Sequence, residues 1–147
     1  MDTRTPKKRS EIMSAVRTKD TGPELLVRKL LSVQGYRYRI HQKELPGRPD
    51  IVFPGRHKAI FVHGCFWHGH RCRKGRLPKS HLRYWRPKIA ANKMRDSKNL
   101  VSLRRSGWKA LVIWQCELKK GDRLMRKLKT FLGRPHGRKR KKGQISI

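Results

Sequence analysis

Two short apolar runs constrain the fold of this chain more than any other feature. Residues 59–65 (AIFVHGC) and 108–116 (WKALVIWQC) are almost continuously hydrophobic, which is typical of strands buried on both faces of a sheet. A helical pattern over 81–106, with a break expected at 85–87 where a proline occurs, separates the two runs. This helix can cross over from one strand to the other, so both strands belong in one sheet.

Further periodic segments surround these two strands. They are a helix over 18–36, a half-buried strand over 36–41, another strand that begins at Asp50, and an amphipathic helix over 122–132. The order helix, three strands, helix, strand, helix predicts an α/β fold with a central mixed β-sheet flanked by helices. The first three strands can form a meander.

Charge is the most unusual property of the composition. The 147 residues carry 40 Lys and Arg against nine Asp and Glu, a formal net charge of +31. Such self-repulsion favours a polyanionic partner, and nucleic acid fits best because neutralised phosphates release counterions. A membrane surface fits less well, since we find no basic amphipathic helix with a broad apolar face. Without a spanning segment or signal-peptide pattern, and with an odd number of cysteines, we expect an intracellular, cytoplasmic protein. We also expect it to be nucleoid-associated and monomeric.

Charge also suggests how the chain is divided. We expect residues 1–20 to form a basic arm with a short helix at 10–17 that contacts DNA, and residues 21–132 to form the folded domain. The basic, Gly- and Pro-containing residues 133–147 predict a tail that is disordered when free.

Cysteine and histidine spacing predicts a zinc site. Cys65, His70 and Cys72 lie within eight residues, and zinc prefers four tetrahedral sulfur and nitrogen ligands. Cys116 follows the last strand as Cys65 follows the third, so adjacent strand ends would complete a closed, structural Cys3His site. Alternatively, the cysteines are buried strand-end residues and the histidines are solvated, or another histidine replaces His70.

Three acidic residues are informative in so basic a chain. Asp50, at the start of an apolar strand, could hold Mg²⁺ through oxygen, but it also suits a turn that bonds local N–H groups. Glu24 has capping-box spacing from Thr21, and capping is the better interpretation from spacing alone. Asp96 is expected to pair with a nearby Arg or Lys on its helix face.

The same region supplies histidines and aromatics. His63 and His68 are not needed for zinc, and either could transfer a proton near a phosphodiester because histidine titrates near neutral pH. Phe66, Trp67 and Trp85 lie among basic residues outside the apolar runs. They either stack on or wedge between bases, or cover the zinc loop.

Several longer motifs resemble the very short patch repair (Vsr) endonucleases. These are RSEIMSAVRTKDTGPE, LPGRPDIVF, AIFVHGCFWHGHRC, YWRPKIAANKMRD and GWKALVIWQC. The likeness spans roughly residues 8–118, so residues 21–132 would be the endonuclease domain. The resemblance implies a type II restriction-endonuclease-like fold with a structural zinc. It also implies a Mg²⁺-dependent enzyme that nicks duplex DNA on the 5′ side of the thymine in a T·G mismatch, which repairs deaminated 5-methylcytosine.

The resemblance assigns roles to single residues. Asp50 and the backbone carbonyl of Val62 would bind Mg²⁺, although a threonine is familiar at the latter position. His68 would be catalytic, His63 would support the metal's water shell, and Glu24 would also be required. Glu24 would then both cap its helix and orient metal-bound water, which changes the interpretation from spacing alone. The zinc ligands would be Cys65, His70, Cys72 and Cys116.

DNA contacts follow from the same resemblance. Phe66, Trp67 and Trp85 would wedge beside the mismatch from the major groove, and the N-terminal helix with Met13 would enter the minor groove. We also expect contacts from Asn92, Lys93 and Arg95, and mismatch-repair helper proteins as possible partners. Two other functions stay open on sequence grounds: a less selective DNA endonuclease of the same fold, and a noncatalytic DNA-binding module.

Overall fold

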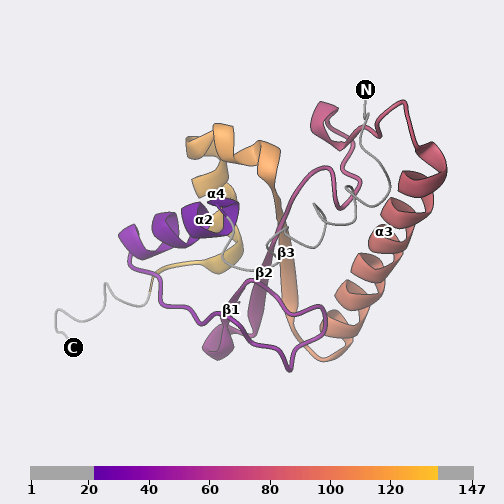
Figure 1. The fold of residues 1–147 in the computed structure, drawn as a ribbon. Helices are drawn as coiled ribbons and strands as arrows, with labels where there is room; N and C mark the ends of the chain where they lie inside the picture. The colour runs from indigo at the N-terminus through magenta and orange to yellow at the C-terminus, as the bar shows by residue number, and fades with distance from the viewer. Residues whose placement is uncertain (1–21, 136–147) are drawn as a thin grey trace, which may run out of the picture.

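A computed structural model describes residues 22–135 as a small mixed α/β structure (Figure 1). Its sheet has the order β1-β2-β3, in which β1 (Ile51–Phe53) pairs antiparallel with β2 (Lys58–His63) and β3 (Lys109–Trp114) pairs parallel with β2. The helices are α2 (Gly22–Val33), α3 (Leu82–Arg105) and α4 (Gly121–Leu132). The predicted mixed sheet flanked by helices is confirmed, whereas the expected helix at 10–17, with Met13, lies outside the described residues.

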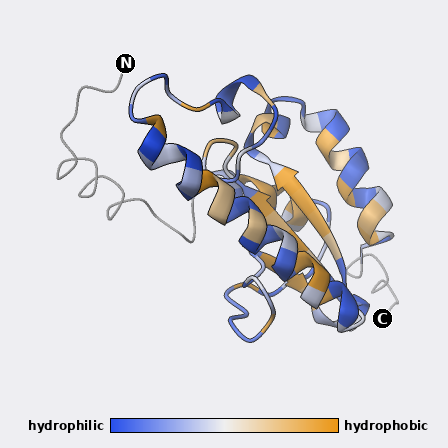
Figure 2. Ribbon diagram, turned by 90° about the vertical axis from the view of Figure 1, so that its right-hand side faces the viewer, coloured by the Kyte–Doolittle hydropathy of each residue, from blue (hydrophilic) through white to orange (hydrophobic). Residues whose placement is uncertain are grey.

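β2 is central because both of its faces are covered. Ile60 and Val62 point into a core shared with α2 and α4, and Ala59 and Phe61 point into a second core beneath α3. Successive strand side chains alternate between faces, so a strand covered on both sides is hydrophobic without interruption. Figure 1 shows α2 and α4 on one side of the sheet and α3 on the other, and Figure 2 shows hydrophobic residues concentrated on the strands.

α3 connects β2 to β3 as a crossover, but the break predicted at 85–87 is wrong. Pro87 lies inside a continuous helix that begins at Leu82. Near a helix start proline removes one hydrogen bond, here to the carbonyl of Arg83. Both residues are exposed, so water can satisfy that carbonyl.

The strand predicted at 36–41 is also wrong, although its alternation is real. Among residues 22–135, this segment forms one isolated bridge, between Arg39 and Val52. His41 then adopts a left-handed backbone conformation (φ 58°), which ends the extended stretch. Tyr36 and Tyr38 nevertheless pack edge-on against Phe53, with ring centroids 6.5 and 6.4 Å away. The expected meander is therefore a β1–β2 hairpin with an extended segment beside it.

The last helix follows its sequence pattern. Leu124, Leu128 and Leu132 are aligned and buried in the core shared with α2. Side chains of Arg56 and Lys58 bind backbone carbonyls at the C-terminal end of α4, where cations are favourable. Within the described residues, no helix combines the length and hydropathy required to cross a bilayer.

Candidate active site and metal cluster

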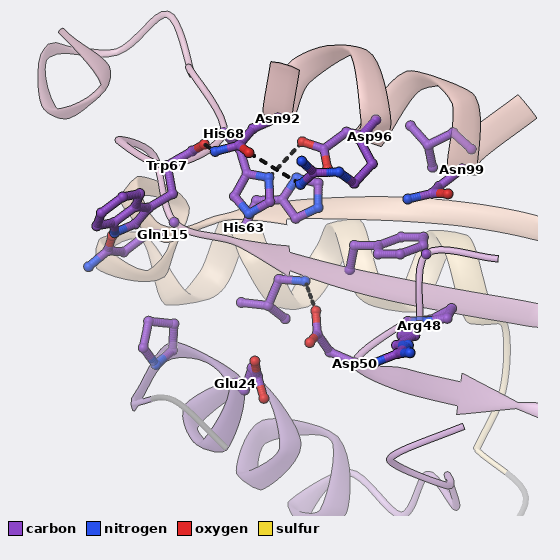
Figure 3. A pocket seen from close by; sticks show the side chains of 18 of the residues that line it. Glu24, Arg48, Asp50, His63, Trp67, His68, Asn92, Asp96, Asn99 and Gln115 are labelled. Carbon is purple, nitrogen blue, oxygen red and sulfur yellow. Dashed lines mark hydrogen bonds and ion pairs between the residues drawn. The ribbon is translucent and has the colours of Figure 1, made fainter. Parts of the chain in front are cut away.

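A cavity of about 650 Å³ opens where β2 ends. Its lining comes from segments far apart in the sequence, and Figure 3 shows their side chains turned toward one space. The ionisable side chains of interest are those of Glu24, Asp50, His63, His68 and Asp96. The fold thus gathers all four predicted catalytic residues, Glu24, Asp50, His63 and His68, in one pocket.

Asp50 is held at the edge of the sheet just before β1. Its Oδ2 accepts a hydrogen bond from the Val62 N–H at 2.6 Å, and its own N–H donates to the Ile60 carbonyl at 3.1 Å. Burial raises the pKa of Asp50 to about 8; the Val62 N–H opposes this rise, and the nearby Glu24 carboxyl adds to it. Asp50 is therefore a half-buried acid beside a second, buried acid.

Glu24 projects from α2 toward Asp50 and is only 3% exposed (Figure 3). Arg28, one turn further along α2, places Nη2 3.3 Å from Glu24 Oε2. Thr21, the proposed capping partner, lies outside the described residues. Sequence reasoning did not single out Arg28, although its i,i+4 spacing from Glu24 could have indicated the pair.

A second group joins β2, the following loop and α3. The His63 and His68 rings stack with centroids 3.8 Å apart and an interplanar angle of 3°. His68 Nδ1 lies 2.6 Å from Asp96 Oδ2. Burial, with a smaller contribution from His68, lowers the pKa of His63 to about 4, so His63 is neutral at neutral pH.

The prediction that Asp96 pairs with an Arg or Lys of its own helix is therefore wrong, because its partner is His68. Asp96 lies one helical turn beyond the buried Asn92 and so faces inward, toward His68, instead of an Arg or Lys of its own helix. A single sequence cannot report which side of α3 faces the loop, since the helix has charged residues all around it.

The predicted metal ligands form a separate cluster. One ligand atom from each of Cys65, His70, Cys72 and Cys116 lies within 4.8 Å of the others. The prediction that two strand ends bring Cys65 and Cys116 together is confirmed, because the Cys116 N–H donates to Cys65 Sγ at 3.4 Å. Cys116 Sγ also lies 3.6 Å from His70 Nδ1. This cluster could hold a metal ion.

The aromatic side chains pack against one another beside that cluster. Phe66 contacts Trp67 and Trp85 with centroids 5.2 and 5.0 Å away, and Trp85 is only 7% exposed. Phe66 and Trp67 are half-buried. Asn92 Nδ2 donates to the Trp67 carbonyl at 2.8 Å, and so links α3 to the loop that carries the aromatics.

The basic residues expected to meet DNA differ in their surroundings. Arg95 is exposed, lines the cavity and donates to Asn92 Oδ1 at 3.2 Å. Lys93 is exposed and lies over Gly69, where an added Cβ would approach Lys93 Cδ to 2.7 Å. Gly69 also has a positive φ of 62°. Glycine therefore suits this turn both because no Cβ fits beside Lys93 and because it adopts a positive φ without strain.

Comparison with known proteins identifies the family. The sequence profile described as "DNA mismatch endonuclease Vsr" matches residues 1–74. The Escherichia coli K12 protein named DNA mismatch endonuclease Vsr is 39% identical over 116 residues, which cover 79% of this chain and 74% of that protein. This chain belongs to the Vsr family. It is accordingly a DNA endonuclease, and nucleases of this family depend on metal ions.

Other Vsr relatives carry nicking-enzyme names. The Type II nicking enzyme V.XorIIP of Xanthomonas oryzae pv. oryzae is 53% identical over 131 residues, covering 89% of this chain and 96% of the relative. The Type II nicking enzyme V.NmeAIP of Neisseria meningitidis is 49% identical over 115 residues, covering 78% and 82%. The matched regions thus include the described sheet and much of the pocket.

Proposed function

We propose that this Vsr-family endonuclease nicks duplex DNA on the 5′ side of the thymine in a T·G mismatch, with Mg²⁺ as its catalytic ion. The observation that carries the proposal is the convergence of two carboxyls and a histidine–aspartate pair in one cavity. Oxygen donors beside a proton acceptor are what metal-assisted phosphodiester hydrolysis requires.

The donor chemistry around Asp50 fits magnesium. Asp50 and Glu24 offer carboxylate oxygens, which hard cations prefer over nitrogen or sulfur. The N–H and C=O of a strand residue point toward the same neighbouring strand, so the Val62 carbonyl points to the side on which its N–H meets Asp50. When bound, Mg²⁺ would offset the charge of the phosphate and make an attacking water more acidic.

The two histidines would take part in proton transfer from the attacking water. We assign His68 as the group that accepts a proton from the attacking water, because Asp96 holds its Nδ1 and leaves Nε2 to act. Water attacks phosphorus in line, a phosphorus–oxygen bond breaks, and the leaving oxygen gains a proton. His63, neutral and stacked on His68, would support the water shell of a bound ion.

The second cluster fits zinc. Three sulfurs and one nitrogen within 4.8 Å of one another suit a four-coordinate ion with Zn–S bonds of about 2.3 Å. All four positions would be filled by Cys65, His70, Cys72 and Cys116, which gives a structural role and leaves no place for substrate. Such an ion would fasten the loop after β2 to the end of β3.

The aromatic cluster supports mismatch recognition. We infer that Phe66 and Trp67 enter the base stack, that Trp85 supports them from the side, and that Lys93 and Arg95 contact the DNA. A mispaired step is easier to unstack than a paired one, which provides selectivity before chemistry. Asn92 contributes by holding the aromatic loop through its hydrogen bond to the Trp67 carbonyl.

The mixed sheet with helices on both faces is compatible with the proposed restriction-endonuclease-like fold.

The test compares two labelled duplexes that differ only in T·G against T·A. With Mg²⁺ we expect one nick, 5′ of the mismatched thymine, and none when a chelator is added. Equal nicking of both duplexes would favour the less selective nuclease, for which the charge of +31 is the supporting observation. Full activity of Asp50→Ala would overturn the proposed site.

A further inference from the structure

A basic loop overlaps the Cys/His cluster at Cys72, and its basic side chains are used by neither site described above. It spans residues 71–79 (RCRKGRLPK), and its five basic side chains are all exposed, namely those of Arg71, Arg73, Lys74, Arg76 and Lys79. No acidic residue occurs in the sequence between Asp50 and Asp96. Like charges held this close repel one another, so the loop suits an anionic partner that neutralises them.

The cluster holds this loop in place. Cys72 belongs to the cluster, and a short 3-10 turn, Arg73–Gly75, follows it directly. The Gly75 N–H donates to the Cys72 carbonyl at 3.0 Å. A Cβ built at Gly75 would lie 1.9 Å from the His70 carbonyl oxygen, so the turn's backbone lies directly against that of His70. The basic side chains therefore project from an anchored backbone.

The positive surface continues toward the cavity. The loop leads into α3, where Arg83, Arg86 and Lys88 are also exposed and Lys88 lines the cavity. At the start of α3, Trp85 belongs to the aromatic cluster, since its ring centroid lies 5.0 Å from that of Phe66. Figure 1 shows the loop at the end of the sheet where β2 and β3 finish.

We propose that the basic loop binds backbone phosphates of the duplex flanking the nick site, and that the Cys/His cluster sets its position. The inference rests on the DNA endonuclease activity of this chain and is independent of the T·G preference, since phosphate contacts carry no sequence information. The cluster would thereby link metal content to DNA affinity.

The experiment measures how affinity for a T·A duplex and for its T·G counterpart falls with salt. The loop variant is Arg73→Gln, Lys74→Gln and Arg76→Gln. The control variant Arg123→Gln, Arg126→Gln and Lys129→Gln removes equal charge from exposed positions of α4, across the sheet from α3. A third variant, Arg73→Lys and Arg76→Lys, keeps the positive charge of the loop.

Each lost phosphate contact lowers the slope of log affinity against log salt by about 0.9. The loop variant should lose about 2.7 from the slope, so the affinity change between about 50 and 200 mM salt becomes about 40-fold smaller. The control and lysine variants should keep the wild-type slope. An unchanged slope in the loop variant, or an equal loss in the control, would overturn the proposal.

Comparing the two duplexes separates this inference from the proposed function. The loop variant should keep the wild-type ratio of T·G to T·A affinity, and loss of that ratio would show that the loop reads the mismatch instead of phosphates. If the wild type itself binds both duplexes equally, the T·G proposal fails while the slopes still decide the role of the loop.

Discussion

Replacing Asp96 with asparagine tests the role of the histidine–aspartate pair. The substitution preserves shape but removes the negative charge that faces His68 Nδ1 at 2.6 Å. Asparagine can also turn its amide N–H toward Nδ1, which would place the histidine proton on Nε2 and block proton acceptance there. We expect a lower rate of nicking with little change in DNA affinity.

The magnitude follows from the type of hydrogen bond. The two side chains are 28% and 22% exposed, so solvent screens the pair only in part. A hydrogen bond to a charged group contributes about 1.5–3 kcal/mol. If that contribution is made in the transition state, kcat should fall about 10- to 100-fold, since each tenfold corresponds to about 1.4 kcal/mol.

Single-turnover nicking at saturating enzyme separates the rate from binding, which is measured by titration with a labelled duplex. The matched control is Asp122→Asn, an exposed acid in the first turn of α4 that should leave both quantities unchanged. A wild-type rate for Asp96→Asn, or an equal loss in the control, would refute the assignment. The melting temperature and metal content of Asp96→Asn should match those of the wild type.

Three further predictions concern other parts of the site. Burial raises the pKa of Asp50 from 3.8 to about 8, so its protonated form contributes stability that is present below about pH 4 and lost as pH rises through 8. Asp50→Asn should abolish nicking, and its melting temperature should exceed that of metal-free wild type by an amount that grows between about pH 4 and pH 8. A difference in melting temperature that stays constant over this pH range would contradict the raised pKa of Asp50. Purified protein should contain about one zinc per chain, and Cys116→Ser should lower both metal content and melting temperature; zinc-free protein with full stability would argue against the cluster. Trp67→Ala should reduce selectivity for T·G over T·A without altering metal content, and retained selectivity would exclude the wedge.

Local patterns predicted several features correctly. The continuous apolar runs identified β2 and β3, since strands with apolar neighbours on both faces carry few polar residues. β2 is buried along almost its whole length as expected, whereas β3, at the edge of the sheet, is mostly half-buried. Their parallel arrangement places the strand ends together, which is why Cys65 and Cys116 could be paired from the sequence. The leucine spacing of α4 likewise reported its buried face.

Other features depended on how elements are rotated and placed. The sequence by itself determined α2, α4, the position of α3, the two long strands and the metal-ligand spacing, since each depends on residues close in the chain or at strand ends. It did not show that α3 continues through Pro87. Only the tertiary structure decided that Asp96 faces His68, that Arg28 meets Glu24 beside Asp50, and that 36–41 forms a single bridge. The first two contacts depend on how α3 and α2 are rotated about their axes. The third depends on the short length of β1, the strand beside residues 36–41. Neither the rotation of a helix nor the length of a neighbouring strand is encoded in local periodicity.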